Sequence, residues 1–164
     1  MTGTPDSGRD GAPSGAVAAL MTPLPKAKPV AAMCALYGVK GTVLETSAGA
    51  LVLLEDSSPE TLHTAASVIS KVTKGMPLLA MERRDGQITI WKYADGAQGE
   101  TMPPGLALND APGVLTSLLT GTQTMEQVAA THEDKVASAN MGRFAAFWQL
   151  RKLARAAKRA ARDS

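Results

Sequence analysis

Two small turn residues, Asp85 and Gly86, separate two apolar runs and constrain the fold more than any other feature of this sequence. Both residue types tolerate the positive φ angles of a tight primed turn, so Leu78–Arg83 and Gln87–Tyr93 should form an antiparallel hairpin. The expected cross-strand pairs are Arg84 with Gln87, Met81 with Ile90, Leu79 with Lys92, Ala80 with Trp91 and Leu78 with Tyr93. Neither face of this hairpin is polar throughout. The sheet is therefore expected to be covered on both sides, or to present one aromatic face as a contact surface.

A second hairpin precedes this one in the chain. The apolar runs Thr42–Thr46 and Ala50–Glu55 flank a short link that contains Gly49, which is typical of an antiparallel connection. Between the hairpins, Ser58 is a suitable helix cap and Pro59 suits the first helical position. Apolar residues recur at helical spacing after this cap, so a helix is predicted from Ser58 to about Gly75.

Shorter helices are predicted on both sides of this central region. The apolar stretch after Pro29 favours a short helix that Gly38 ends. Residues 113–119 and a segment beginning at the capping residue Thr124 favour two more helices. Residues 94–112 are rich in proline and glycine, which predicts an extended loop.

The element order predicts an α+β fold. Its small antiparallel sheet would come from the two hairpins with the intervening helix, followed by C-terminal helices that end in a long basic helix. A length of 164 residues with 45% hydrophobic content suits one globular domain with tails. We expect a flexible N-terminal arm over residues 1–28, a body over 29–132 and a long C-terminal helix over 133–164.

Charge is distributed unevenly along the chain. The last fourteen residues contain six basic side chains and one acidic one, whereas the rest of the chain contains eleven basic and fourteen acidic. A mildly acidic body thus ends in a cationic segment, which indicates an anionic partner. The candidate binding residues are Arg151, Lys152, Arg155, Lys158, Arg159 and Arg162.

Helical geometry places Leu150, Leu153 and several alanines on one side of the predicted helix. The opposite side holds five of these basic residues, Arg151, Arg155, Lys158, Arg159 and Arg162. The basic side could contact the phosphates of a nucleic acid, which we favour, or an acidic protein surface or membrane. The basic run is also explained by solvation of a helix end. A second candidate surface is apolar and would serve protein–protein assembly, including homodimer formation, through Phe144, Phe147, Trp148 and Leu150.

Catalytic and metal-binding motifs are not evident. Cys34 with His63 or His132 is the one nucleophile–base pair that the sequence allows, and a buried Cys34 that packs as a small apolar group is the competing interpretation. One cysteine and two distant histidines do not match a zinc site, and no phosphate-binding glycine motif is present. No catalytic residue, metal or cofactor is therefore predicted. A single cysteine also predicts no internal disulfide and favours a cytoplasmic protein.

Trp91 and Tyr93 alternate on a predicted strand and could stack on bases, but packing against the C-terminal helix is the preferred interpretation. Three functional classes remain: a regulator or adaptor that binds nucleic acid, an assembly or chaperone-like module, and a small enzyme with an unrecognised site. We adopt the first as the hypothesis and the second as its alternative.

Overall fold

The computed structural model describes residues 16–109, 111–140 and 150–159. Within these ranges the chain is an α+β protein with a seven-stranded antiparallel sheet. The strands are β1 (Val17–Met21), β2 (Gly41–Thr46), β3 (Gly49–Leu54), β4 (Leu78–Arg84), β5 (Gln87–Ala94), β6 (Ala97–Met102) and β7 (Val136–Ser138). The helices are α2 (Ala27–Leu36), α3 (Pro59–Val72), α4 (Pro104–Ala107), α5 (Gly113–Thr120) and α6 (Met125–Thr131), with a 3₁₀ turn η1 (Glu133–Lys135). Residues 150–159 are also helical and are called the C-terminal helix below.

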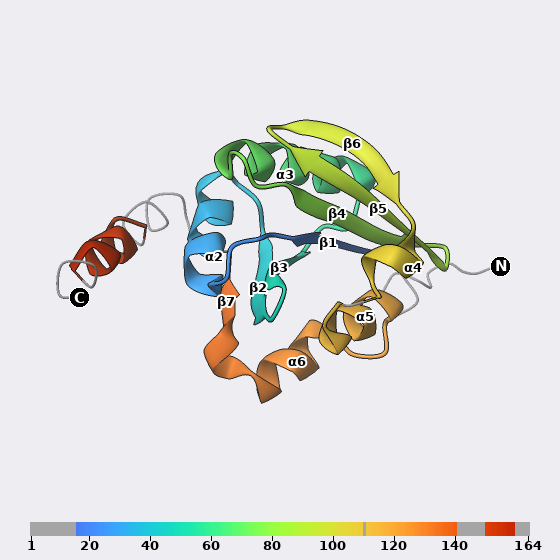
Figure 1. Cartoon of the computed structure of the whole chain (residues 1–164). Helices are drawn as coiled ribbons and strands as arrows, with labels where there is room; N and C mark the ends of the chain where they lie inside the picture. The colour runs from blue at the N-terminus through green and yellow to red at the C-terminus, as the bar shows by residue number, and fades with distance from the viewer. Residues whose placement is uncertain (1–15, 110, 141–149, 160–164) are drawn as a thin grey trace.

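The sheet separates two helical layers (Figure 1). Its strand order is β6-β5-β4-β1-β3-β2-β7. Helices α2 and α3 cover one face, and α4, α5 and α6 cover the other. Side chains of β1 alternate between the layers: Ala18 and Leu20 belong to the first core, and Ala19 and Met21 to the second. The central strands are thus buried on both faces, which is the first of the two predicted alternatives, whereas β6 at the edge is exposed.

Both hairpins and several helices are confirmed. Strands β2 and β3 pair from Gly41 to Leu54, and β4 and β5 pair with the predicted register. Asp85 and Gly86 have φ angles of 54° and 78°, the left-handed values that a primed turn requires. The Ser58 side chain accepts a hydrogen bond from the Thr61 backbone and caps α3. Helix α6 begins with a full capping box, in which Thr124 and Gln127 each bond the other's backbone.

The expected flexible arm over residues 1–28 is wrong from residue 16 onward. Residues 16–28 contain β1 and the start of α2, and β1 pairs with both β3 and β4 at the centre of the sheet. The two hairpins therefore lie on either side of β1 and do not form the sheet by themselves. A strand buried on both faces has no polar–apolar alternation, so the run Val17–Met21 carried no strand pattern among its proline- and glycine-rich neighbours.

The expected loop over residues 94–112 is also wrong. It contains strand β6 and the short helix α4. Asp95 and Gly96 form a second tight turn, with φ angles of 50° and 85°, and this turn returns the chain alongside β5. It repeats the Asp-Gly signal at Asp85 and Gly86, so the sequence contained the information needed to place β6.

The expected long C-terminal helix over residues 133–164 is wrong over its first part. Residues 133–138 form η1 and β7, and β7 pairs with β2 at one edge of the sheet. The Asn140 side chain accepts a hydrogen bond from the Gly41 backbone, which extends this attachment. In the part of the chain that the structure describes, the helical segment nearest the C-terminus covers residues 150–159.

Replacement of Leu20 by Ala tests the role of β1. Leu20 is fully buried, so this change should lower the free energy of unfolding by about 2–5 kcal/mol. Leu106→Ala is the matched control because Leu106 is 69% exposed, and it should change stability by less than about 0.5 kcal/mol. Urea unfolding followed by circular dichroism measures both. Equal stability of the two variants would mean that residues 17–21 are an unstructured arm after all.

Candidate anionic-partner surface

The C-terminal helix presents its basic side chains to solvent. Arg151, Lys152, Arg155, Lys158 and Arg159 are all exposed, and no acidic residue lies within residues 150–159. Leu150 and Leu153 are half-buried. The remaining predicted contact residues, Phe144, Phe147, Trp148 and Arg162, lie outside the described residues.

Helical geometry places the basic and apolar residues on opposite sides. Arg151, Arg155 and Arg159 recur every four residues and form one row along the helix. Leu153 is two positions from Arg151 and from Arg155, which is roughly 200° around the axis. Leu153 and Ala157 line a cavity of about 660 Å³ that is also bounded by the start of α2 and by η1 and β7. The apolar side therefore faces the body, and the basic row faces away from it.

Three lysines of the body border the same cavity. Lys26 and Lys28 come from the start of α2, and Lys135 comes from η1. Glu45 and Asp134 lie among them and partly offset their charge. Glu45 already has a partner, because its carboxylate accepts a hydrogen bond of 3.0 Å from the Ala27 backbone at the start of α2. Sequence reasoning missed these lysines because three segments far apart in the chain supply them, and only the folded sheet brings them together.

Trp91 and Tyr93 pack against α3 and not against the C-terminal helix, which corrects the preferred sequence interpretation. The His63 ring meets Trp91 edge-on, with centroids 4.6 Å apart, and lies 5.9 Å from the Tyr93 ring. Tyr93 is 3% exposed and Trp91 is half-buried. The Tyr93 ring is therefore covered, and the half-buried Trp91 packs against the core beneath α3.

The hydroxyl of Tyr93 ties together α3 and β6. It lies 2.5 Å from His63 Nδ1 and donates to Gln98 Oε1 at 3.2 Å. A hydroxyl has one proton to donate, so with Gln98 as its acceptor the Tyr93 oxygen accepts from His63 Nδ1–H. Burial raises the pKa of Tyr93, which keeps the hydroxyl protonated. This network joins α3 to β6 through β5.

Cys34 does not form the dyad that the sequence allowed. Its thiol is buried in the core beneath α2, and burial raises its pKa to about 12. A thiolate is thus disfavoured at neutral pH, and His63 is engaged with Tyr93 instead. Cys34 packs as a small apolar residue, as the competing interpretation proposed.

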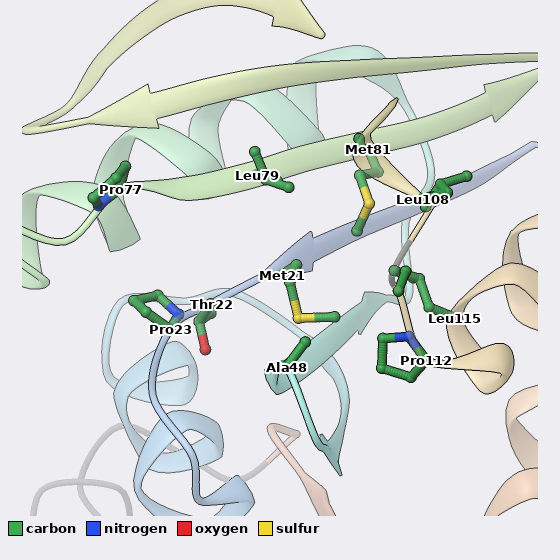
Figure 2. A pocket seen from close by; sticks show the side chains of 12 residues that line it. Met21, Thr22, Pro23, Ala48, Pro77, Leu79, Met81, Leu108, Pro112 and Leu115 are labelled. Atoms are coloured by element: carbon green, nitrogen blue, oxygen red, sulfur yellow. The ribbon is translucent and has the colours of Figure 1, made fainter. Parts of the chain in front are cut away.

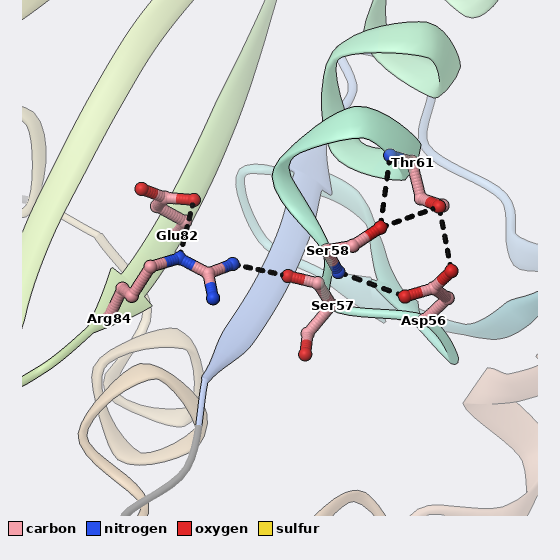
Figure 3. A network of polar contacts seen from close by, with 6 residues as sticks. All are labelled: Asp56, Ser57, Ser58, Thr61, Glu82 and Arg84. Atoms are coloured by element: carbon pink, nitrogen blue, oxygen red, sulfur yellow. Dashed lines mark hydrogen bonds and ion pairs between the residues drawn. The ribbon is translucent and has the colours of Figure 1, made fainter.

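Polar contacts around Asp56 and Arg84 anchor the start of α3 (Figure 3). Asp56 accepts hydrogen bonds from the Ser58 backbone and from the Thr61 hydroxyl, and these bonds lower its pKa, with the Ser58 backbone contributing most. Arg84 donates to the Ser57 carbonyl at 2.6 Å and pairs with Glu82 at 3.6 Å. Asp56 and Ser58 thus form the cap of α3, and Arg84 links the end of β4 to the loop before that helix.

In the part of the chain that the structure describes, no cluster of three or more His, Cys, Asp or Glu side chains could hold a metal ion. Among the helices placed in residues 16–109, 111–140 and 150–159, none has the length and apolar content to cross a membrane.

Tyr93→Phe should lower the free energy of unfolding by about 1 kcal/mol, because it removes the hydroxyl that links His63 and Gln98. Tyr37→Phe is the matched control, since Tyr37 is 47% exposed and should tolerate the change. Thermal and urea unfolding of both variants provide the measurement. A Tyr93→Phe protein as stable as Tyr37→Phe would contradict the proposed link between α3 and β6.

The buried thiol also predicts a pH dependence. The pKa of Cys34 rises from 9.0 to about 12 on folding, so the unfolded chain loses this proton first as pH increases. Stability from the buried thiol is fully present below pH 9 and is lost between pH 9 and 12. From pH 8 to pH 10 the wild type should lose roughly 1–2 kcal/mol more than Cys34→Ala, as measured by urea unfolding. Equal losses would mean that the thiol is accessible.

Comparison with known proteins gives no relative: no family model, no curated protein and no solved structure matches this chain. Its function is inferred from its own residues.

Proposed function

We propose that this protein is a non-enzymatic binding module whose basic C-terminal helix holds an anionic partner, with nucleic acid favoured. The observation that carries the proposal is the five exposed basic side chains within residues 150–159, which contain no acidic residue. Matching of the helix dipole needs only one or two cations in the last turn. The excess of positive charge favours a polyanionic ligand.

The geometry of the basic row suits phosphates. Arg151, Arg155 and Arg159 repeat at about 6 Å along the helix axis, since each residue advances it by about 1.5 Å. Guanidinium groups bind phosphate oxygens in a planar, two-pronged arrangement, and neutralisation of several phosphates releases counterions. Affinity should therefore come mainly from the backbone of the nucleic acid and depend strongly on salt.

The apolar side of the same helix favours nucleic acid over a membrane surface. Membrane-bound amphipathic helices bury an apolar face with large side chains in the lipid. In the described helix, Leu153 and Ala157 are instead turned toward the cavity beside α2. Lys26, Lys28 and Lys135 border this cavity and add positive charge on the body beside the helix, on the side opposite the basic row.

Replacement of Arg155, Lys158 and Arg159 by Gln tests the proposal. All three are exposed, so the variant should fold normally and bind a fluorescein-labelled 20-nucleotide single strand or duplex at least tenfold more weakly at 50 mM salt. The slope of log K against log salt should become less steep by about 2–3, because three phosphate contacts are lost. Fluorescence anisotropy from 50 to 200 mM salt measures both quantities.

The control replaces Lys40, Lys74 and Lys92 by Gln. These lysines are exposed and do not line the cavity beside the helix, and their loss changes net charge equally. If both variants weaken binding equally, the interaction depends on net charge alone and not on the C-terminal helix. If the wild type does not bind, the proposal is refuted. Salt-resistant self-association that Leu150→Ser abolishes would instead support the alternative, an assembly module whose contact includes Phe144, Phe147, Trp148 and Leu150.

A further inference from the structure

A cavity of about 320 Å³ opens on the sheet face that α4 and α5 cover. Strands β1 and β4, the turn between β2 and β3, and the α4–α5 segment contribute to its lining. Figure 2 shows Met21 in the middle of this lining, between Leu79 and Met81 of β4 and Pro112 and Leu115 of the facing segment. The cavity lies within the size range of small-molecule pockets in proteins.

The cavity has a buried floor and an exposed mouth. Met81 and Leu115 are 0% and 3% exposed, and Met21 is also buried. Pro23 and Pro77, in contrast, are exposed, as is Ala48 at the turn between β2 and β3. A ligand can therefore enter from solvent and bury its surface against the floor without prior opening of the fold.

The lining is mainly apolar. Among the described residues that line the cavity, Thr22 is the one with a polar side chain, and none is charged. The Thr22 hydroxyl donates to the Ala50 carbonyl at 2.9 Å, so its proton is already used. A charged or strongly polar ligand would lose its hydration without compensation. The bound part of a ligand must therefore be uncharged and apolar.

Prolines at the mouth disfavour a peptide as the occupant. Pro23, Pro77 and Pro112 supply no backbone N–H, so the carbonyls of a bound peptide would find few donors there. A hydrocarbon chain or an apolar ring has no carbonyl group and needs no hydrogen-bond donor. Met21 and Met81 add adaptability, since the unbranched thioether side chain fits varied apolar shapes.

We infer that this cavity binds a small uncharged apolar molecule, a hydrocarbon chain or ring, which enters between Pro23, Ala48 and Pro77 and rests on Met21 and Met81. The site is independent of the basic helix, because no residue of the C-terminal helix contributes to it.

The experiment is a titration of the full chain with Nile red, an uncharged apolar dye that becomes fluorescent in apolar surroundings. The wild type should bind the dye with one-to-one saturation, and 1-decanol should displace it. Ala48→Trp places a bulky side chain at the mouth and should weaken dye binding at least tenfold. Ala97→Trp is the matched control: Ala97 is also an exposed alanine beside a tight turn, it does not line the cavity, and it should leave the affinity within twofold of wild type.

A second variant keeps the inference testable if Ala48→Trp does not fold, which melting by circular dichroism would reveal. Ala111→Leu extends a half-buried lining residue into the cavity, and it should weaken dye binding and raise the melting temperature. Lack of saturable binding by the wild type would overturn the inference. Equal affinities of Ala48→Trp and Ala97→Trp, or failure of 1-decanol to compete, would overturn it too.

Discussion

The pairing of β1 with β3 and β4 is the interaction on which the rest of this structure depends. Five residues, Val17–Met21, join two hairpins that otherwise share no strand pair, and they supply side chains to both helical layers. Two small residues, Ala18 and Ala19, lie in this strand. The helices on each face can therefore approach the sheet closely at its centre, where large side chains would hold them away.

Local signals in the sequence predicted the local structure well. The Asp85–Gly86 turn determined a register of seven residue pairs, and the caps at Ser58 and Thr124 placed the starts of two helices. Elements that depend on distant partners were missed. Strands β1 and β7 are short and lack alternation, so tertiary pairing rather than intrinsic pattern specifies them. Strand β6 is different, because the Asp95–Gly96 pair signals the turn before it. The prolines that follow led instead to the prediction of a loop.

The candidate surface also has one part that the sequence predicts and another that only the fold reveals. The basic row of the C-terminal helix follows from helical periodicity alone, and its exposure agrees with that pattern. Lys26, Lys28 and Lys135 could not be assigned to it from sequence, since the arrangement of α2 beside η1 is a property of the whole sheet. The apolar cavity could not be predicted from the sequence either. Met21, Leu79 and Leu115 resemble ordinary core residues in the sequence, and only the folded chain shows that the space between them is unfilled.

The attachment of β7 to β2 has a consequence for synthesis of the chain. Thr42 pairs with Ser138, so the edge of β2 has no partner until 96 further residues have been translated. At ordinary ribosomal speeds this takes roughly 5 to 20 seconds, which is long compared with hairpin formation. During that interval the nascent β2–β3 hairpin exposes backbone donors and acceptors that another chain could pair with. Synthesis of β7, and not formation of the hairpins, then sets the earliest moment at which this edge is protected.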